Sequence, residues 1–298
     1  MRLLALCLGA ASLLCGQAPQ PDGAGLLPGT LPAKWNTGGP DCAVLPAFQI
    51  HEYNPDLFIL RESGCTHYEK PFLYLFFGQK MALLTDTGAG KVETAAAVDG
   101  VIRAWAQKHG RAPESIELLV VHTHSHSDHT AGDPTFAGRP HTRVVPVALN
   151  AIQEAFQIAH WPEDTGSVDL GDRQIQVLPI PGHDELSLAF YDSRTGILLT
   201  GDTLYPGRLY VADFPQFLAS IQRLEKFTDG KLIAHVLGNH IEQSSTPFLD
   251  YKVGTRYQPN EHSLELTHAH ILELRLALEA MHGRPVRYAA ADFTIWPK

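Results

Sequence analysis

Histidines and carboxylates crowd one short stretch of the chain, directly after the apolar run 118–121. His124, His126, Asp128 and His129 all lie in this stretch. Histidine is the commonest metal ligand, and carboxylates complete many metal sites. In an extended segment, the side chains of His124 and His126 point the same way and can bind one ion. The chain must turn after Ser127, so Asp128 and His129 can face a second ion. The spacing therefore predicts two neighbouring metal ions at the end of a buried strand.

Further short motifs lie before and after this stretch. The stretch itself contains Thr-His-Ser-His-Ser-Asp-His at 123–129, and the other motifs are Thr85-Asp86-Thr87-Gly88, Pro181-Gly182-His183, Thr200-Gly201-Asp202-Thr203 and Gly238-Asn239-His240. The ordered set resembles the motifs of the metallo-β-lactamase superfamily. The resemblance implies an α/β fold, a four-layer αββα sandwich, with the ligands on loops that follow strands.

The resemblance also implies a role for each candidate residue. One metal takes His124, His126 and His183, the other takes Asp128, His129 and His240, and Asp202 bridges the two ions. We expect Asp86 to hold a ligand imidazole in one tautomer from behind. His122 alternates with His124, but the family pattern leaves it outside the metal ligands, as a supporting or spacer residue.

The ligand set predicts a hydrolytic mechanism. Two divalent ions held a few Å apart lower the pKa of a shared water from about 16 towards about 7. The resulting bridging hydroxide attacks a carbonyl carbon or a phosphorus, and Asp128 accepts and returns the proton. Zinc is the first expectation because it is redox-silent and suits these ligands, with iron or manganese also possible.

The bond that is cleaved stays open between an ester, a lactone, a thioester and an amide of a small molecule. A bridging Asp202 is unusual in true β-lactamases of the superfamily, so β-lactam cleavage is a second choice. After His183 the chain reads Asp184-Glu185-Leu186-Ser187, where relatives usually have Thr-x-Gly-Ser. Two further interpretations stay open, namely a single-iron sulfur oxygenase on the same fold and a non-catalytic metal-binding protein.

Composition and the N-terminus predict an exported protein of one large domain. The chain has 298 residues, with 32 acidic against 23 basic side chains, which disfavours a nucleic-acid partner. Residues 1–18 read as a secretory signal peptide, 19–42 as an extended leader, and 43–298 as the hydrolase domain. We expect a periplasmic or secreted protein with no membrane span in its mature chain. Its oligomeric state is not predicted.

Two cysteines remain after the signal peptide is removed. Cys42 and Cys65 form an even pair in an exported chain, which favours a disulfide that ties the leader to the first sheet. Two independent buried thiols are the alternative, because spacing alone does not bring the Cα atoms together.

Hydrophobic patterning places strands and helices around the motifs. Residues 72–86 read as a hairpin that turns at Gly78 and Gln79, and strands are expected at 48–51, 57–60, 116–121, 143–147, 175–180, 186–191, 197–200 and 232–237, the last of the chain. Helices are expected from Val92 to near Gly110, at 148–159, at 214–227, and in a tail capped by Ser263.

Four residues near the last two ligand motifs are candidates for substrate contact. Tyr205 and Tyr210 follow Asp202 directly, where an aromatic side chain can border a pocket. Tyr257 and His262 belong to the polar, irregular stretch 256–262 after the last ligand. A plain connector is the alternative interpretation of that stretch.

Overall fold

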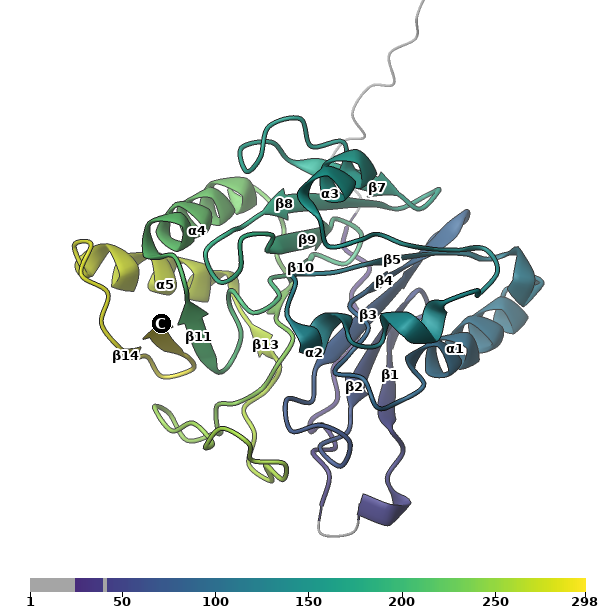
Figure 1. Cartoon of the computed structure of the whole chain (residues 1–298), viewed down its shortest axis with the longest axis horizontal. Coiled ribbons are helices and arrows are strands. Elements are labelled where there is room, and N and C mark those ends of the chain that lie inside the picture. The colour runs from purple at the N-terminus through teal and green to yellow at the C-terminus, as the bar shows by residue number, and fades with distance from the viewer. Residues whose placement is uncertain (1–24, 40–41) are drawn as a thin grey trace, which may run out of the picture.

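Two six-stranded sheets form the centre of the protein (Figure 1). The computed structural model describes residues 25–39 and 42–298, so the expected signal peptide, 1–18, lies outside the described residues. The first sheet has the order β1 (Phe48–Asn54), β2 (Leu57–Glu62), β3 (Phe72–Phe77), β4 (Met81–Thr85), β5 (Glu117–Val121) and β6 (Thr142–Val144). The second has the order β13 (Glu265–Leu266), β12 (His235–Leu237), β10 (Ile197–Leu199), β9 (Leu188–Asp192), β8 (Gln174–Pro179) and β7 (Gly166–Asp169).

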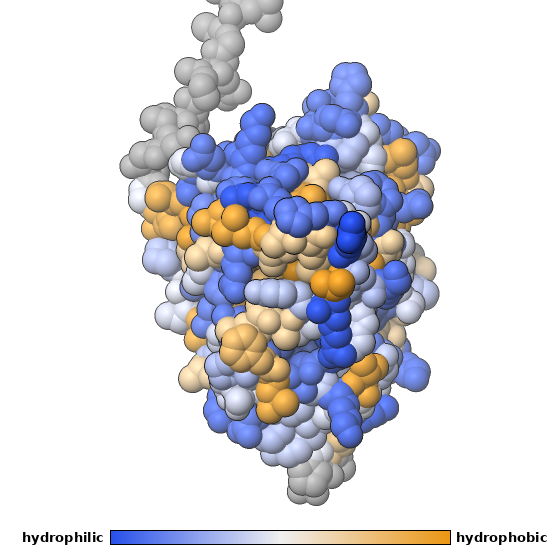
Figure 2. All heavy atoms as spheres, turned by 90° about the vertical axis from the view of Figure 1, so that its left-hand side faces the viewer, coloured by the Kyte–Doolittle hydropathy of each residue, from blue (hydrophilic) through white to orange (hydrophobic). Residues whose placement is uncertain are grey.

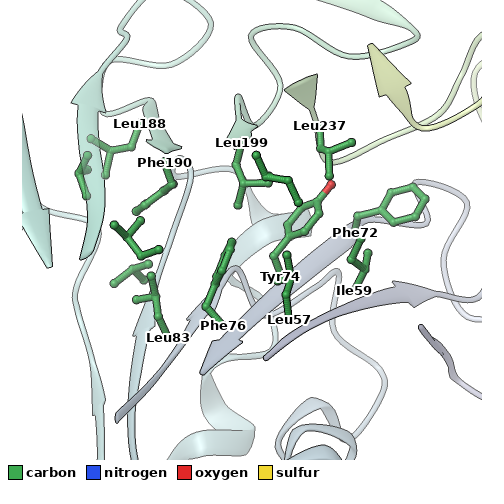
Figure 3. Close-up of a cluster of buried hydrophobic side chains, with 14 of the residues drawn as sticks. Leu57, Ile59, Phe72, Tyr74, Phe76, Leu83, Leu188, Phe190, Leu199 and Leu237 are labelled. Carbon is green, nitrogen blue, oxygen red and sulfur yellow. The ribbon is translucent and has the colours of Figure 1, made fainter. Parts of the chain in front are cut away.

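The sheets pack face to face through side chains that alternate along their strands. Tyr74 and Phe76 of β3 point towards Phe190 and Leu199 of the second sheet (Figure 3). The alternate residues of β3, Leu73, Leu75 and Phe77, point the opposite way and belong to a second core, on the outer face of the first sheet. Strands β2, β3, β4 and β5 therefore contribute to two apolar layers, which is why β2 and β3 are buried along their whole length.

Helices cover the outer face of each sheet (Figure 1). Helix α1 (Thr94–Lys108) covers the first sheet with Val98, Ile102 and Trp105. Helices α4 (Phe214–Thr228) and α5 (His268–Ala280) cover the second sheet. These layers confirm the αββα sandwich, and the turn of the β3–β4 hairpin lies at 78–80, as the sequence indicated.

Several elements differ from the sequence expectation. The tail helix begins at His268 under a capping box of Thr267 and His270, so the cap expected at Ser263 is wrong. Leu264 instead lies in the core between the sheets, and β13 follows it. The expected last strand is followed by β13, β14 (Tyr288–Ala289) and β15 (Thr294–Pro297). The short strands β14 and β15 form a third sheet with β11 (Arg208–Val211). The sequence did not predict this sheet, because the apolar runs of its strands are too short to be recognised.

The remaining helices are short. Helix α3 (Leu149–Phe156) is shorter than expected, α2 (Ser127–Thr130) follows β5, and three 3-10 turns lie at Cys42–Val44, Pro113–Ser115 and Asp133–Phe136.

The described part of the leader runs along the domain surface. Leu27 donates its backbone N–H to Arg194 O, and Thr30 donates to Tyr53 O. Cys42 and Cys65 form a disulfide, with their Cα atoms 5.3 Å apart. The predicted bridge is therefore present, and it joins the end of the leader to the loop between β2 and β3.

Hydrophilic side chains dominate the face that Figure 2 turns to the viewer, with hydrophobic ones in separate patches. Leu272 and Leu276 of α5, and Val286 and Tyr288 beyond it, are exposed large hydrophobic side chains. No helix within 25–39 and 42–298 has the length and apolarity that crossing a bilayer requires.

A buried ion pair joins β2 to the segment after the last ligand motif. Arg61 donates from Nη1 and Nη2 to the two carboxylate oxygens of Glu261, each at 2.6 Å. The side chains are 0% and 6% exposed, and the Arg61 guanidinium lies 4.8 Å above the ring of Phe72. Burial raises the pKa of Glu261, and Arg61 opposes that rise.

We predict that Glu261→Gln lowers the free energy of unfolding by about 3–5 kcal/mol, because it leaves a buried guanidinium uncompensated. Replacing both partners with apolar residues, as in Arg61→Met with Glu261→Leu, recovers most of that loss. Urea titrations monitored by circular dichroism measure the free energy of unfolding of the single and the double variant. Glu279→Gln, which breaks an exposed pair with Arg275 on α5, is the control and leaves the midpoint unchanged. A Glu261→Gln protein as stable as this control contradicts the prediction.

Candidate metal centre

The predicted ligands come together because the strands that carry them end at the same edge. Strands β4 and β5 are parallel, as are β10 and β12, so the loops that follow them leave their sheets at one end. These loops carry Asp86, the stretch 122–129, Asp202 and His240, and the loop after β8 adds His183. Residues more than a hundred positions apart in the chain thus become neighbours.

Three histidines form the first group of candidate ligands. His124 Nε2 lies 3.0 Å from His126 Nδ1, and His183 Nε2 lies 3.1 Å from the same atom. The rings of His124 and His183 are buried, and His126 is partly exposed. The group is the one that the sequence assigned to a single ion.

The second group contains Asp128, His129, Asp202 and His240. His240 Nε2 lies 3.3 Å from Asp128 Oδ2 and 3.3 Å from His129 Nε2. Asp128 and His129 reach this group from α2, the turn that the sequence required after Ser127. All four ligand atoms lie within 4.8 Å of one another.

Asp202 stands between the two groups. Its Oδ2 lies 3.9 Å from His124 Nε2 and 3.8 Å from His183 Nε2. Its Oδ1 faces the other group, 3.6 Å from His129 Nε2 and 3.3 Å from His240 Nε2. Each carboxylate oxygen therefore faces a different group, which is the geometry of a bridging ligand.

Acceptors outside the centre fix the tautomers of two ligand rings. Tyr210 O accepts from His183 Nδ1 at 2.8 Å, and Glu69 O accepts from His240 Nδ1 at 2.9 Å. A carbonyl oxygen only accepts, so both Nδ1 atoms carry hydrogen. In the neutral rings, Nε2 then presents a lone pair towards the centre.

Asp86 organises the other two buried rings. Its Oδ2 accepts from the Thr123 hydroxyl at 2.9 Å and lies 3.2 Å from His129 Nδ1. Since the Thr123 hydroxyl donates to Asp86, its oxygen is left to accept from His124 Nδ1 at 3.2 Å. The same carboxylate accepts from the Thr123 backbone N–H and the Asn239 amide, each at 2.7 Å. One carboxylate thus connects both histidine motifs.

The donor set fits a cation. The Nε2 atoms of His124 and His183 both face His126 Nδ1, which carries at most one hydrogen and cannot satisfy both lone pairs. Asp202 Oδ1 is buried and has no hydrogen-bond partner among the described residues. Buried acceptors without donors are costly, and a metal ion satisfies all of them.

The two groups differ in their affinity for protons. Burial lowers the pKa of both His124 and His183, in the first case well below its usual value. Burial also opposes charge on His129 and His240, but Asp128 and Asp202 outweigh it and hold both pKa values well above the usual range. His124 and His183 are therefore neutral near pH 7, while the second group (Asp128, His129, Asp202 and His240, hereafter the Asp–His group) holds protons in the absence of metal.

Backbone geometry supports the loops that carry the ligands. Asp86 has a φ of +64°, a left-handed conformation that is uncommon for residues other than glycine and frequent at functional sites. Gly182, next to His183, has a φ of +137°, and a Cβ there meets Phe217 Cα at 2.4 Å. A side chain at position 182 would therefore displace the loop that holds His183.

His122 lies outside both ligand groups. Its Nε2 is 2.9 Å from Asp133 Oδ1, and its Nδ1 is buried without a partner among the described residues. The ring therefore supports the loop through Asp133 and takes no ligand position.

The four candidates for substrate contact have different positions. Tyr205 is 1% exposed, donates its hydroxyl to Arg208 O, and packs its ring 5.7 Å from that of the candidate ligand His240. His262 forms hydrogen bonds through both ring nitrogens, with Ser263 O and with Asp292. Tyr257 is exposed in the connector, and Tyr210 is partly buried beside His183.

Sequence reasoning missed three partners of the ligands. Thr123 and Asn239 stand directly beside His124 and His240, and their adjacency in the motifs was an available signal. The carbonyl of Glu69 lies in a loop far from any motif, so no residue type marks it.

Comparison with known proteins agrees with this geometry. The family description Metallo-beta-lactamase superfamily matches residues 72–245. A hydroxyacylglutathione hydrolase of Aeromonas hydrophila is 32% identical over 115 residues, which cover 37% of this chain and 44% of that protein. An acyl-coenzyme A thioesterase, MBLAC2, of Bos taurus is 25% identical over 206 residues, which cover 56% and 72%.

The fold is similar to that of solved metallo-beta-lactamase structures. The structure of a metallo-beta-lactamase from Pontibacter korlensis superposes with a TM-score of 0.52 at 16% identity, covering 78% of this chain and 99% of that one. The chain spans about half the length of the curated relatives it matches first, between 34% and 58%. The family match extends over more than half of the sequence and includes all seven candidate ligands. The chain therefore belongs to the metallo-β-lactamase superfamily.

Proposed function

We propose that the protein is a metal-dependent hydrolase that cleaves an ester, lactone, thioester or amide of a small molecule. The observation that carries this proposal is the position of Asp202, which directs one oxygen to each of two groups of buried ring nitrogens. Two divalent ions in such a centre polarise a carbonyl oxygen and lower the pKa of a bound water towards about 7. Zinc suits the imidazole and carboxylate donors and is the first choice.

Asp128 is the residue proposed to accept and return the proton of the attacking water. Burial raises its pKa, but His129 and His240 outweigh burial, so the carboxylate is ionised at neutral pH. Its side chain is 20% exposed, more than that of Asp202 at 9%, so it is the more accessible of the two carboxylates to water. An ionised carboxylate at that position can take a proton from a water that enters with substrate.

Among the possible bonds, a thioester has additional support. Relatives that match this chain are named a hydroxyacylglutathione hydrolase and an acyl-coenzyme A thioesterase. Asp184 nevertheless replaces the threonine usual after the third histidine motif, and its Oδ2 accepts from Ser125 while Oδ1 accepts from Leu186 N–H. The loop is tied by its own carboxylate, so substrate contacts known from relatives do not transfer to it.

Export is a second part of the proposal. Residues 1–18 have the pattern of a secretory signal, and disulfides such as Cys42–Cys65 persist in oxidising compartments. The molecular mass of the chain recovered from a periplasmic extract tests the proposed export. A chain that still contains residues 1–18 contradicts the removal of a signal peptide.

We predict about two metal ions per purified chain, and loss of activated-ester turnover in His126→Ala by at least about a hundredfold, because the three-histidine group loses a donor. Elemental analysis and a panel of ester, lactone, thioester, β-lactam and phosphodiester substrates provide the measurement. His160→Ala, which removes a ring 80% exposed on the surface, is the matched control. Full activity in His126→Ala refutes the proposed centre, and one iron with oxygen consumption replaces hydrolysis by oxygenase chemistry.

We predict that the two ions are lost at different pH values. His129 and His240 hold protons in the metal-free protein, so the ion of the Asp–His group must displace them, whereas His124 and His183 are already neutral. As the pH falls from about 8 to about 5, the Asp–His group therefore empties first.

Equilibrium dialysis at a series of pH values, followed by elemental analysis, shows this as a plateau near one ion per chain. Titration calorimetry in two buffers of different ionisation enthalpy shows that the second ion releases more protons than the first. In His183→Ala the plateau disappears, because the group that retains metal is damaged. Loss of both ions in a single step in the unmodified protein contradicts the assignment.

A further inference from the structure

A surface groove of about 670 Å³ runs along α5. Leu272 and Leu276, one helical turn apart, line it from the helix, and Val286 and Tyr288 line it from the segment that follows. All four are exposed large hydrophobic side chains. Exposed apolar side chains that are contiguous, rather than scattered singly, are typical of a surface that contacts another protein.

Helix α5 has a second apolar face, which the fold already uses. Ile271, Leu274 and Leu278 are buried in the core that the second sheet shares with α4. That face is sufficient to hold the helix on the sheet, as in an ordinary amphipathic surface helix. The outward stripe of Leu272 and Leu276 is therefore not explained by the packing of the helix in its own chain.

The charged side chains of α5 on the side of α4 are paired within the chain. Arg275 forms ion pairs with Glu225 of α4 and with Glu279. Gln222 of α4 also donates to the Glu279 carboxylate. This side of the helix has its polar partners in place.

Two charges beside the groove have no such partner. Glu273 lines the groove, and Arg284 belongs to the exposed run 282–289, between the lining residues Met281 and Val286. In contrast to Arg275, neither Glu273 nor Arg284 forms an ion pair in the described part of the chain. An unpaired acid and an unpaired base thus accompany the same apolar surface.

The order of these charges makes the surface complementary to itself. Glu273 lies in the middle of α5, and Arg284 lies beyond its C-terminal end. A two-fold axis across the groove brings Glu273 of each copy towards Arg284 of the other, because every contact of such an interface occurs twice. A different protein would have to match the apolar stripe and both charges, whereas a second copy matches them by symmetry.

The strand beside the groove is an edge strand. In the third sheet, β14 is the outer strand and pairs with β15. Tyr288 belongs both to β14 and to the groove, so a partner in the groove also lies beside this edge. Proteins commonly shorten, charge or cover such edges, and a second copy covers this one.

We propose that α5 and residues 282–289 form a two-fold interface between two copies of this chain. Leu272 and Leu276 pack against their counterparts, and Glu273 pairs with Arg284 of the second copy. The inference does not depend on the proposed hydrolase function, because α5 contains no member of either ligand group.

Sedimentation equilibrium of the metal-loaded protein, from about 1 to about 100 μM, tests the interface and should show a monomer–dimer equilibrium. In Leu276→Asp we expect the dissociation constant to rise at least about a hundredfold, because two apolar contacts are lost in each dimer. Leu232→Asp is the matched control: Leu232 is 57% exposed, against 52% for Leu276, but lies outside the groove. Circular dichroism checks that both variants are folded.

An exchange of charges tests the two-fold arrangement without altering the apolar stripe. Glu273→Arg and Arg284→Glu should each raise the dissociation constant about three- to tenfold, because like charges then face each other. The variant with both changes should recover the original value. A mixture of the two single variants should associate more tightly than either variant alone, since each copy then faces an opposite charge.

A protein that stays monomeric over the whole concentration range overturns the inference. A dimer that Leu276→Asp and Leu232→Asp affect equally also overturns it, because the contact then lies elsewhere on the surface. Failure of both the double variant and the mixture to recover affinity overturns the two-fold pairing of Glu273 with Arg284.

Discussion

The buried carboxylate of Asp86 is the constraint on which the metal centre depends. It accepts from the backbone and hydroxyl of Thr123 and from the amide of Asn239, and it lies against His129. These groups come from the loops after β5 and β12, which belong to different sheets. A fully buried carboxylate is stable only when hydrogen bonds replace its water. The two halves of the sandwich must therefore meet in one register for Asp86 to be satisfied, and that register brings the ligands together.

A second layer of buried charge fixes the loops on the far side of His240. Arg208 bonds Glu242 and Asp250, Arg61 bonds Glu261, and Lys70 donates to two carbonyls. Replacing such pairs with apolar residues often costs no stability. We therefore infer that these pairs serve to hold the loops near His240 in fixed positions. Hydrogen bonds are directional and fix the orientation of a loop, whereas apolar contacts are non-directional and allow a loop to shift. The loops at the centre are accordingly fixed by polar contacts, and the sheets beneath them by apolar ones.

Local spacing indicated that the residues of the first histidine motif share one site, whereas His183, Asp202 and His240 were assigned to it only through the family resemblance. His124, His126, Asp128 and His129 lie within one strand end and one turn, so spacing alone determines which way each points. Local pattern also gave no indication that the Tyr205 hydroxyl is buried, because its burial depends on a contact with Glu242, 37 residues away in the chain. The helix cap at Ser263 failed for a related reason: pairing of β13 with β12 extends the chain as far as Thr267. Tertiary pairing outweighed local pattern in both cases.

The carbonyls of Glu69 and Tyr210 show a deeper limit of sequence reasoning. Every residue has a carbonyl, so its role in holding a ligand ring leaves no mark on the residue type. These two groups nonetheless determine which nitrogen of His240 and His183 faces the centre. A change in the β2–β3 loop that shifts the Glu69 carbonyl therefore alters the orientation of His240, although the loop itself carries no candidate ligand.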